Sequence, residues 1–151
     1  MNRPVDAPSD LGLAYRMRMA VLAGACFGVL MVARWLDPAP VGFGTHQQLG
    51  LGGCTFLELA GHPCPMCGAT TTFALLADGF LGEGFRNQPF AAVLFLLTVA
   101  ATGISLSEVI QPRARWARVG KWVEPIETQL AMIFVAALFV GWTYKVWMMA
   151  H

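Results

Sequence analysis

Three long apolar segments constrain the fold of this chain more than any other feature. They cover residues 17–36, 89–110 and 126–149, and each is at least 20 residues long. A helix rises about 1.5 Å per residue, so each segment can cross a hydrocarbon core about 30 Å thick. The composition agrees, because 56% of the residues are apolar and only 13% are charged, which is about half the usual charge of a soluble domain. We therefore predict an all-α integral membrane protein with three transmembrane helices.

A short polar tail precedes the first apolar segment, and the rest of the chain forms one membrane domain. We assign residues 1–16 to the tail and residues 17–151 to the domain. A charged flank followed by an apolar run also fits a cleaved signal peptide. No small-residue cleavage site follows this run, and Arg34 and Trp35 at its end are typical of an anchor at the membrane interface. We therefore expect the first segment to remain as a helix.

The distribution of basic residues predicts how the chain is oriented in the membrane. Seven of the ten Lys and Arg residues lie near the N-terminus or between the second and third apolar segments: Arg3, Arg16, Arg18, Arg113, Arg115, Arg118 and Lys121. Such an excess is typical of the cytoplasmic side of a membrane. We therefore expect the N-terminus in the cytoplasm, and residues 41–88 together with the C-terminus on the periplasmic or outer side. Disulfides form on that side but not in the cytoplasm.

The candidate site lies in residues 41–88, between the first two apolar segments. This region holds three of the four cysteines within fourteen residues, namely Cys54, Cys64 and Cys67. A proline directly follows Cys64, and proline is favoured at the first helical position, so we predict a short helix over residues 65–77. This helix is too short to cross a bilayer and is therefore interfacial or re-entrant on the outer face. The dipole at its N-terminus would stabilise a thiolate.

The three cysteines are compatible with three kinds of site. We favour a structural role, in which Cys54 forms a disulfide with Cys64 or Cys67, or in which the thiols are free and unreactive. A second possibility is a metal site for an ion such as zinc, with three thiolates and either His46 or His62 as the fourth ligand. The third is redox exchange by Cys64 and Cys67 with Cys54 as a resolving thiol. Membrane thiol oxidoreductases usually need a fourth helix and a second cysteine pair, which this chain lacks.

The sequence also predicts contacts for several residues inside the spans. Gly24 and Gly28 form a G-x-x-x-G pair in the first segment, a spacing that lets another helix approach closely. We expect Glu108 to pair with an arginine of the loop that follows the second segment. Lys145, near the end of the third segment, is expected to extend its side chain to the membrane surface.

The cysteine region resembles a known family in its motif Gly-His-Pro-Cys-Pro-Met-Cys-Gly-Ala-Thr at residues 61–70 and its later segment Asn-Gln-Pro-Phe at 87–90. It is similar to the bacterial integral membrane family catalogued as domain of unknown function 2752, which has a Cys-Pro-x-Cys-Gly-x-Thr signature and an upstream cysteine. The residues that match the signature are Cys54, Cys64, Cys67, Gly68 and Thr70. Thr71 stands where many members carry Arg, so no role of that arginine transfers to this chain. The resemblance implies a bacterial inner membrane protein and implies no activity.

These observations favour a non-catalytic accessory or structural subunit of a larger membrane assembly, with the cysteine loop as a structural element on the outer face. Its partners would be the lipid bilayer and other membrane subunits, or further copies of itself. The alternative is a membrane thiol–disulfide redox component that uses Cys64 and Cys67. No basic run suggests a nucleic acid partner.

Overall fold

The computed structural model describes residues 12–150, and this part of the chain contains helices and loops but no strands. Three helices are long and apolar enough to cross a membrane: α1 (Leu13–Trp35), α5 (Pro89–Ile110) and α7 (Glu127–Ala150), which continues from shorter helices before it. The short elements are η1 (Thr45–Leu49), α2 (Thr55–Ala60), α3 (Ala69–Ala77), α4 (Leu81–Asn87), α6 (Arg115–Val123) and η2 (Glu124–Ile126). The predicted all-α membrane fold with three spans is confirmed.

The spans differ from their predicted bounds mainly at the start of the chain. The second span has the bounds that we predicted, but α1 begins at Leu13 rather than at residue 17. Four residues assigned to the polar tail therefore belong to the helix. One of them, Tyr15, contacts α5 through a hydrogen bond from its hydroxyl to Glu108 at 3.1 Å. Of the rest of the predicted tail, Gly12 is the N-cap of α1, and residues 1–11 lie outside the described part of the chain.

The prediction of one short helix over residues 65–77 was wrong at its start and incomplete. Helix α3 begins at Ala69, because Gly68 has a left-handed φ of +84° and ends a turn that contains Cys64. Helix α4 and the helix α6, in a stretch that we treated as a loop, were not predicted. Both helices are too short to cross a membrane, and α6 is also amphipathic, so neither has the long, continuously apolar sequence by which the spans were predicted.

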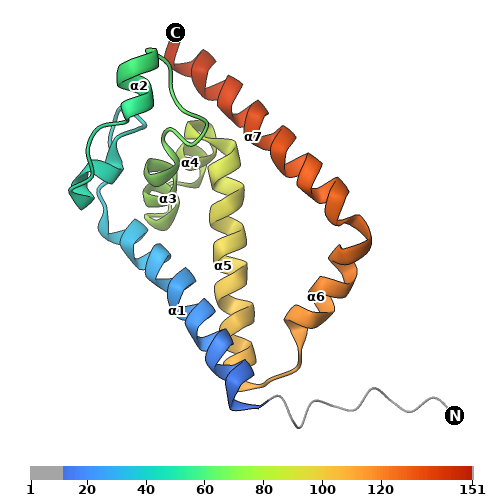
Figure 1. Cartoon of the computed structure of the whole chain (residues 1–151). Coiled ribbons are helices and arrows are strands. Elements are labelled where there is room, and N and C mark those ends of the chain that lie inside the picture. Colours follow the sequence, from blue (N-terminus) through green and yellow to red (C-terminus); the bar gives the residue numbers. More distant parts are fainter. Residues whose placement is uncertain (1–11, 151) are drawn as a thin grey trace, which may run out of the picture.

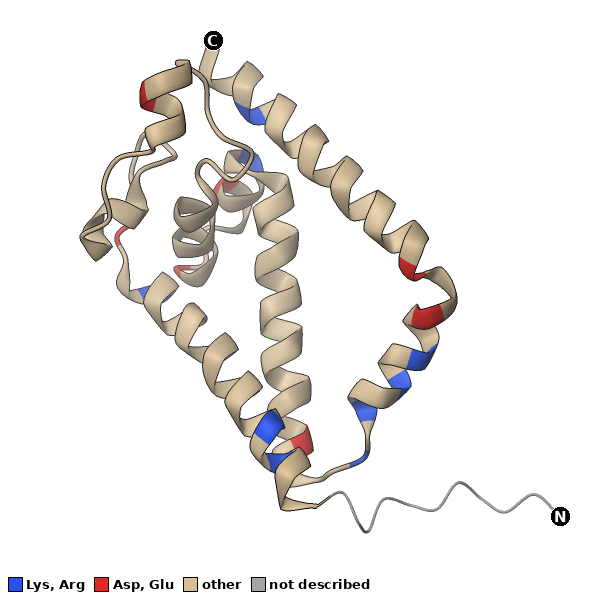
Figure 2. Ribbon diagram, in the orientation of Figure 1, with Lys and Arg blue, Asp and Glu red and all other residues tan. Residues whose placement is uncertain are grey.

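The helices are arranged around α5, as Figure 1 shows. Helix α1 packs along α5, and α3 and α4 fill the space beside one end of this pair. Their core contains Leu76, Ala92 and Phe95, and the ring of Phe73 meets the ring of Phe95 edge to face at 5.3 Å. Helix α7 instead leaves α5 and diverges from it. We call the end with the short helices α2 to α4 the cysteine end. We call the end with α6 the basic end, because most of the Lys and Arg positions, which are blue in Figure 2, lie there.

Glu108 connects three helices at the basic end. Its carboxylate is fully buried and accepts hydrogen bonds from the backbone N–H groups of Arg113, Ala114 and Arg115 at 2.9 to 3.0 Å. It also forms an ion pair with the Arg115 guanidinium at 3.2 Å and accepts the hydrogen bond from Tyr15. The predicted pairing of Glu108 with an arginine of the next segment is confirmed. The carboxylate thereby joins α1, the end of α5 and the start of α6.

We predict that Glu108→Ala releases the start of α6 and lowers the free energy of unfolding by at least about 2 kcal/mol, since hydrogen bonds to a charged group are lost and their donors stay partly buried. The neighbouring substitution Ser107→Ala removes one acceptor of the Arg115 side chain and should cost about half as much. Denaturant unfolding and amide hydrogen exchange over residues 113–123 measure the two effects. Equal exchange rates in the two variants would show that Glu108 does not anchor α6.

Candidate functional site

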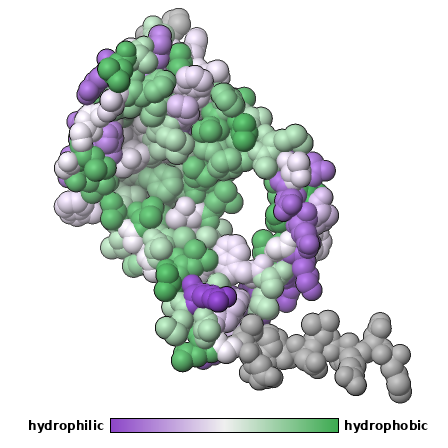
Figure 3. All heavy atoms as spheres, viewed as in Figure 1, coloured by the Kyte–Doolittle hydropathy of each residue, from purple (hydrophilic) through white to green (hydrophobic). Residues whose placement is uncertain are grey.

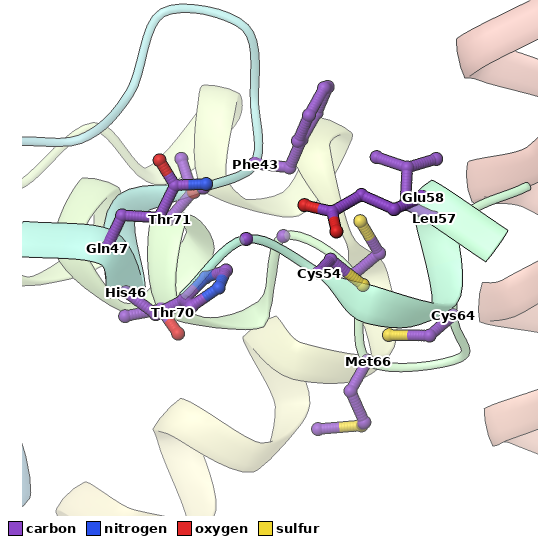
Figure 4. Close-up of a pocket in the computed structure, with 14 residues that line it drawn as sticks. Phe43, His46, Gln47, Cys54, Leu57, Glu58, Cys64, Met66, Thr70 and Thr71 are labelled. Carbon is purple, nitrogen blue, oxygen red and sulfur yellow. The ribbon is translucent and has the colours of Figure 1, made fainter. Parts of the chain in front are cut away.

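The three predicted site cysteines meet in one open pocket of about 340 Å³ at the cysteine end. Cys54, Cys64 and Cys67 all line it, together with His46 and Glu58 (Figure 4). The other predicted ligand, His62, lies elsewhere, in an apolar groove between α2 and α7. Of the two histidines, only His46 shares the pocket with the thiols.

Each thiol is placed by a break in the helices. Cys54 directly precedes α2, and its carbonyl oxygen accepts the N–H of Glu58 at 3.0 Å in the first helical turn. Cys64 and Cys67 belong to one tight turn, in which the N–H of Cys67 donates to the carbonyl oxygen of Cys64 at 2.9 Å. Gly68 follows in the left-handed conformation, and α3 begins after it. The thiols therefore lie on turns outside the helices.

Three side chains bind the carbonyl groups of the turn that carries Cys64 and Cys67. The indole N–H of Trp142 on α7 donates to the Pro63 carbonyl at 2.7 Å, and the Gln88 amide donates to Pro65 at 2.8 Å. The Asn87 amide donates to Gly68 at 3.1 Å and to the Thr72 hydroxyl at 2.9 Å. Because these donors come from α7 and from the junction of α4 and α5, the turn is held from two directions.

Lys145 lies directly behind this turn and is fully buried. Its ammonium group donates to the carbonyl oxygen of Gly42 at 3.1 Å, and to the side-chain and main-chain oxygens of Asn87 at 2.7 and 3.4 Å. The expectation that Lys145 extends to the membrane surface is therefore wrong. Its three N–H groups have three neutral acceptors, and within residues 12–150 no carboxylate forms an ion pair with it.

Gly68 occupies a position that a larger residue could not fill. A Cβ atom there would lie 2.5 Å from the Gly42 carbonyl oxygen and 3.2 Å from both the Asn87 amide nitrogen and the Lys145 ammonium. Its φ of +84° is also unfavourable for L side chains. The glycine thus lets the cysteine turn approach the buried Lys145.

Burial makes the thiols at this turn weak acids. The side chain of Cys67 is 5% exposed, and burial, with smaller contributions from Cys64 and Cys54, raises its pKa to about 11 despite the opposing charge of Lys145. Burial also raises the pKa of Cys64, where the adjacent Cys54 thiol adds to the shift and the N–H of Met66 opposes it. The expected stabilisation of a thiolate by a helix N-terminus is therefore not found, because α3 begins only after Gly68.

The pocket does not form a complete ligand cage. Among residues 12–150, no group of three His, Cys, Asp or Glu side chains is placed to hold a metal ion. All four cysteines are free thiols, including the half-buried Cys26 in α1. Zinc binding by the pocket residues therefore stays a prediction, and it would require the side chains to move together.

Thr71, at the position where the related family often carries Arg, makes a local contact. Its hydroxyl is buried and lies 2.8 Å from the hydroxyl of Thr45, which also accepts the N–H of Ala39. This pair connects α3 to the loop after α1, on the wall of the thiol pocket. No charge is present at this position.

The residues that hold the cysteine turn were not among the predicted site residues. These residues are far along the chain from the groups that they bind: 19 positions for Asn87, 23 for Gln88 and 79 for Trp142, while Lys145 is 58 positions from Asn87. Their roles therefore depend on tertiary contacts. One signal was available for Lys145, because a charged residue inside an apolar span usually faces the protein interior and has a specific partner. Interpreting it as an interfacial residue missed that signal.

We predict that Gly68→Ala lowers the free energy of unfolding by about 2–4 kcal/mol, since left-handed strain adds to overlap with the Gly42 carbonyl. Gly61→Ala is the matched control, because Gly61 has a φ of +68° but nothing lies within 4 Å of its Cβ position. This control should cost only about 1–2 kcal/mol. Chemical unfolding in detergent measures both, and equal losses would show that the turn is not closely packed against Lys145.

One of three comparisons with known proteins returns a match, and it covers the cysteine motif. Searches of curated proteins and of solved structures return no match. Residues 54–102, which include the three site cysteines, Asn87 and Gln88, match the model of a family described as "Protein of unknown function (DUF2752)". The resemblance inferred from the Cys-Pro-x-Cys-Gly-x-Thr motif is thereby confirmed, and the match covers the cysteine region from Cys54 and the first part of α5.

Proposed function

We propose that the chain is a non-catalytic subunit of a larger membrane assembly, in which α7 packs against a transmembrane helix of another protein chain. The single observation that carries this proposal is the exposure of α7. Of its 24 residues, only Gly141 and Lys145 are buried. Helices within a membrane associate through close packing and interhelical hydrogen bonds. The side chains of Trp142, Tyr144 and Lys145 in the second half of α7 bind other parts of this chain, but most of the helix surface is not packed against it.

The space between α5 and α7 supports this proposal. The first turn of α5 contacts α7 through Phe90, whose ring lies 5.0 Å from that of Phe134 and whose side chain packs on Gly141. Beyond these contacts, an apolar groove of about 680 Å³ separates the two helices. Figure 3 shows an opening between the arm formed by α6 and α7 and the rest of the molecule. Ala137 lines the groove, and small residues allow a further helix to approach closely.

A second exposed surface lies on α1. The predicted packing residues Gly24 and Gly28 have open space beside their helix, since apart from their chain neighbours and the adjacent backbone of α1 no described atom lies within 4 Å of their Cβ positions. They therefore remain candidates for contact with a partner. Self-association would use the same surfaces.

The acidity of the thiols favours a structural role of the pocket over catalysis. Reactive cysteines usually have a lowered pKa in an electropositive environment. Burial instead raises the pKa of Cys67 to about 11 and shifts that of Cys64 in the same direction. At neutral pH both groups stay protonated, which suits a packed turn.

We further propose that the protein lies in the bacterial inner membrane with its basic end in the cytoplasm. Among the described residues, the basic end carries Arg16, Arg18, Arg113, Arg115, Arg118 and Lys121. The cysteine end carries Arg34, Arg86 and the buried Lys145. This difference supports the proposal, in which the thiol pocket would lie on the outer side.

A thiol–disulfide redox role is the second candidate, and one observation changes which thiols it would use. The Cys64 thiol is adjacent to Cys54, and both line the open pocket, whereas Cys67 is buried. The redox pair would therefore be Cys54 and Cys64. Forming one S–S bond would release two protons and two electrons, and an external disulfide that is itself reduced to two thiols would accept them.

We predict that a photo-reactive amino acid at Ile133, which faces the groove and is 62% exposed, forms a single protein adduct of defined mass in native membranes. The same group at Phe139 is the control, since Phe139 is 54% exposed but does not line the groove. Electrophoresis and mass spectrometry identify the adducts. An adduct of twice the chain mass would indicate self-association, and lipid adducts alone at both positions would refute the subunit proposal.

We predict that a membrane-impermeant maleimide labels Cys54 in intact cells, because the proposed orientation exposes the pocket on the outer side. A Lys121→Cys variant, made in a background without the natural cysteines, is the control at the basic end and should need permeabilised cells. Labelling only after addition of a reductant would support the Cys54–Cys64 disulfide and the redox candidate. Labelling that requires permeabilisation would contradict the orientation.

A further inference from the structure

The helical stretch that ends in α7 is too long to lie entirely within the hydrocarbon core. Helices α6, η2 and α7 follow one another from Arg115 to Ala150, which is 36 residues. At about 1.5 Å per residue they extend about 54 Å, against a hydrocarbon thickness of about 30 Å. Charged residues are concentrated before Leu130, and Lys145 beyond it is buried. The excess length, and with it α6, therefore lies outside the hydrocarbon.

The start of α6 is attached to the end of α5. The Glu108 carboxylate accepts three consecutive backbone N–H groups at the beginning of α6, as described above. The indole N–H of Trp116 donates to the Ser105 hydroxyl at 3.0 Å. These contacts keep α6 at the level where α5 leaves the membrane.

The two sides of α6 differ in chemistry. At about 100° per residue, Trp116, Val119 and Val123 fall on one side of the helix, and Arg118 and Lys121 fall on the other. Trp122 lies at the edge between Arg118 and Val119 and is 77% exposed. Trp116 contacts the bundle through its hydrogen bond to Ser105, so the opposite side points away from α5. Arg118 and Lys121 are exposed, and neither forms an ion pair within residues 12–150.

The charges near this side are mostly positive. The start of α1 and Arg113 both lie beside the end of α5, because Tyr15 and the Arg113 N–H bind Glu108. Arg16 and Arg18 on α1 and Arg113 before α6 are therefore at the same end of the molecule, where Figure 2 shows most of the blue positions. Glu108 is buried and paired with Arg115. Within residues 12–150, the exposed carboxylates that follow α6 toward α7 are Glu124 and Glu127. Among the described residues, five basic side chains against these two acidic ones leave this surface positive.

We propose that α6 is an interfacial helix that binds the phosphate headgroups of anionic phospholipids through Arg118 and Lys121. A basic helix that also exposes Trp122 beside its basic side chains fits the boundary between headgroups and acyl chains. Each Lys or Arg near an anionic membrane surface strengthens its attraction about fivefold. The proposal is independent of any partner of α7.

The test uses the full chain reconstituted in mixed vesicles of phosphatidylglycerol and phosphatidylcholine. Native mass spectrometry of the gently extracted protein measures the ratio of the two lipids that stay bound. We expect phosphatidylglycerol to be enriched on the wild-type chain. The double variant Arg118→Gln/Lys121→Gln should lose about twenty-fivefold of this preference, because each of the two charges contributes about fivefold. Raising the salt concentration during reconstitution should weaken the wild-type preference in the same direction.

Arg86→Gln is the control, because it removes one exposed positive charge from the cysteine end. It should leave the preference nearly unchanged, and an equal loss would show an effect of net charge alone, which would overturn the proposal. A double variant that keeps the wild-type preference would also overturn it. Quenching of the Trp122 fluorescence by brominated lipid, taken as the difference from Trp122→Phe, gives a second measurement. Trp122 is 77% exposed, and an unquenched signal would place α6 in water and refute the interfacial position.

Discussion

The buried ammonium group of Lys145 is the interaction on which the cysteine end depends. A cation without a carboxylate nearby is costly to bury unless every N–H group has an acceptor at hydrogen-bond distance. Gly42 and Asn87 provide these acceptors. Because they belong to the loop after α1 and to the end of α4, one side chain of α7 determines where both segments lie. The Asn87 amide nitrogen in turn donates to the Gly68 carbonyl and the Thr72 hydroxyl, so the position of Lys145 also affects the start of α3.

Each end of the bundle is therefore organised by one buried charge. At the basic end, the Glu108 carboxylate collects backbone N–H groups, a hydroxyl and a guanidinium from three helices. At the cysteine end, Lys145 collects carbonyl groups. Charged groups within membrane spans often mark ion pathways. These two groups instead form hydrogen bonds to other groups of the same protein. Such contacts are directional, whereas the apolar surfaces between the helices are not, so they define how the helices meet.

The cysteine motif gains a physical explanation from this arrangement. Gly68 is needed because its left-handed backbone and lack of a Cβ let the turn approach the Gly42 carbonyl and Lys145. The carbonyl groups of Pro63 and Pro65, on either side of Cys64, are bound by Trp142 and Gln88. The turn is thus held in place through its backbone carbonyl groups, and these contacts do not involve its thiols. Two of them, Cys54 and Cys64, remain half-buried in the open pocket, and this is where any chemistry of the site would begin.

The sequence by itself determined the class of fold, the three spans and the grouping of the cysteines, because length and hydropathy of a segment suffice to identify a membrane helix. It also determined that Glu108 pairs with a nearby arginine, since their separation of seven residues makes the contact local. Only the tertiary structure decided that α3 begins at Ala69, that Lys145 is buried, and that His46 rather than His62 shares the pocket with the thiols. These features depend on contacts between segments up to 103 positions apart, such as Lys145 with Gly42, and local patterns of hydropathy or turn residues carry no information about such contacts.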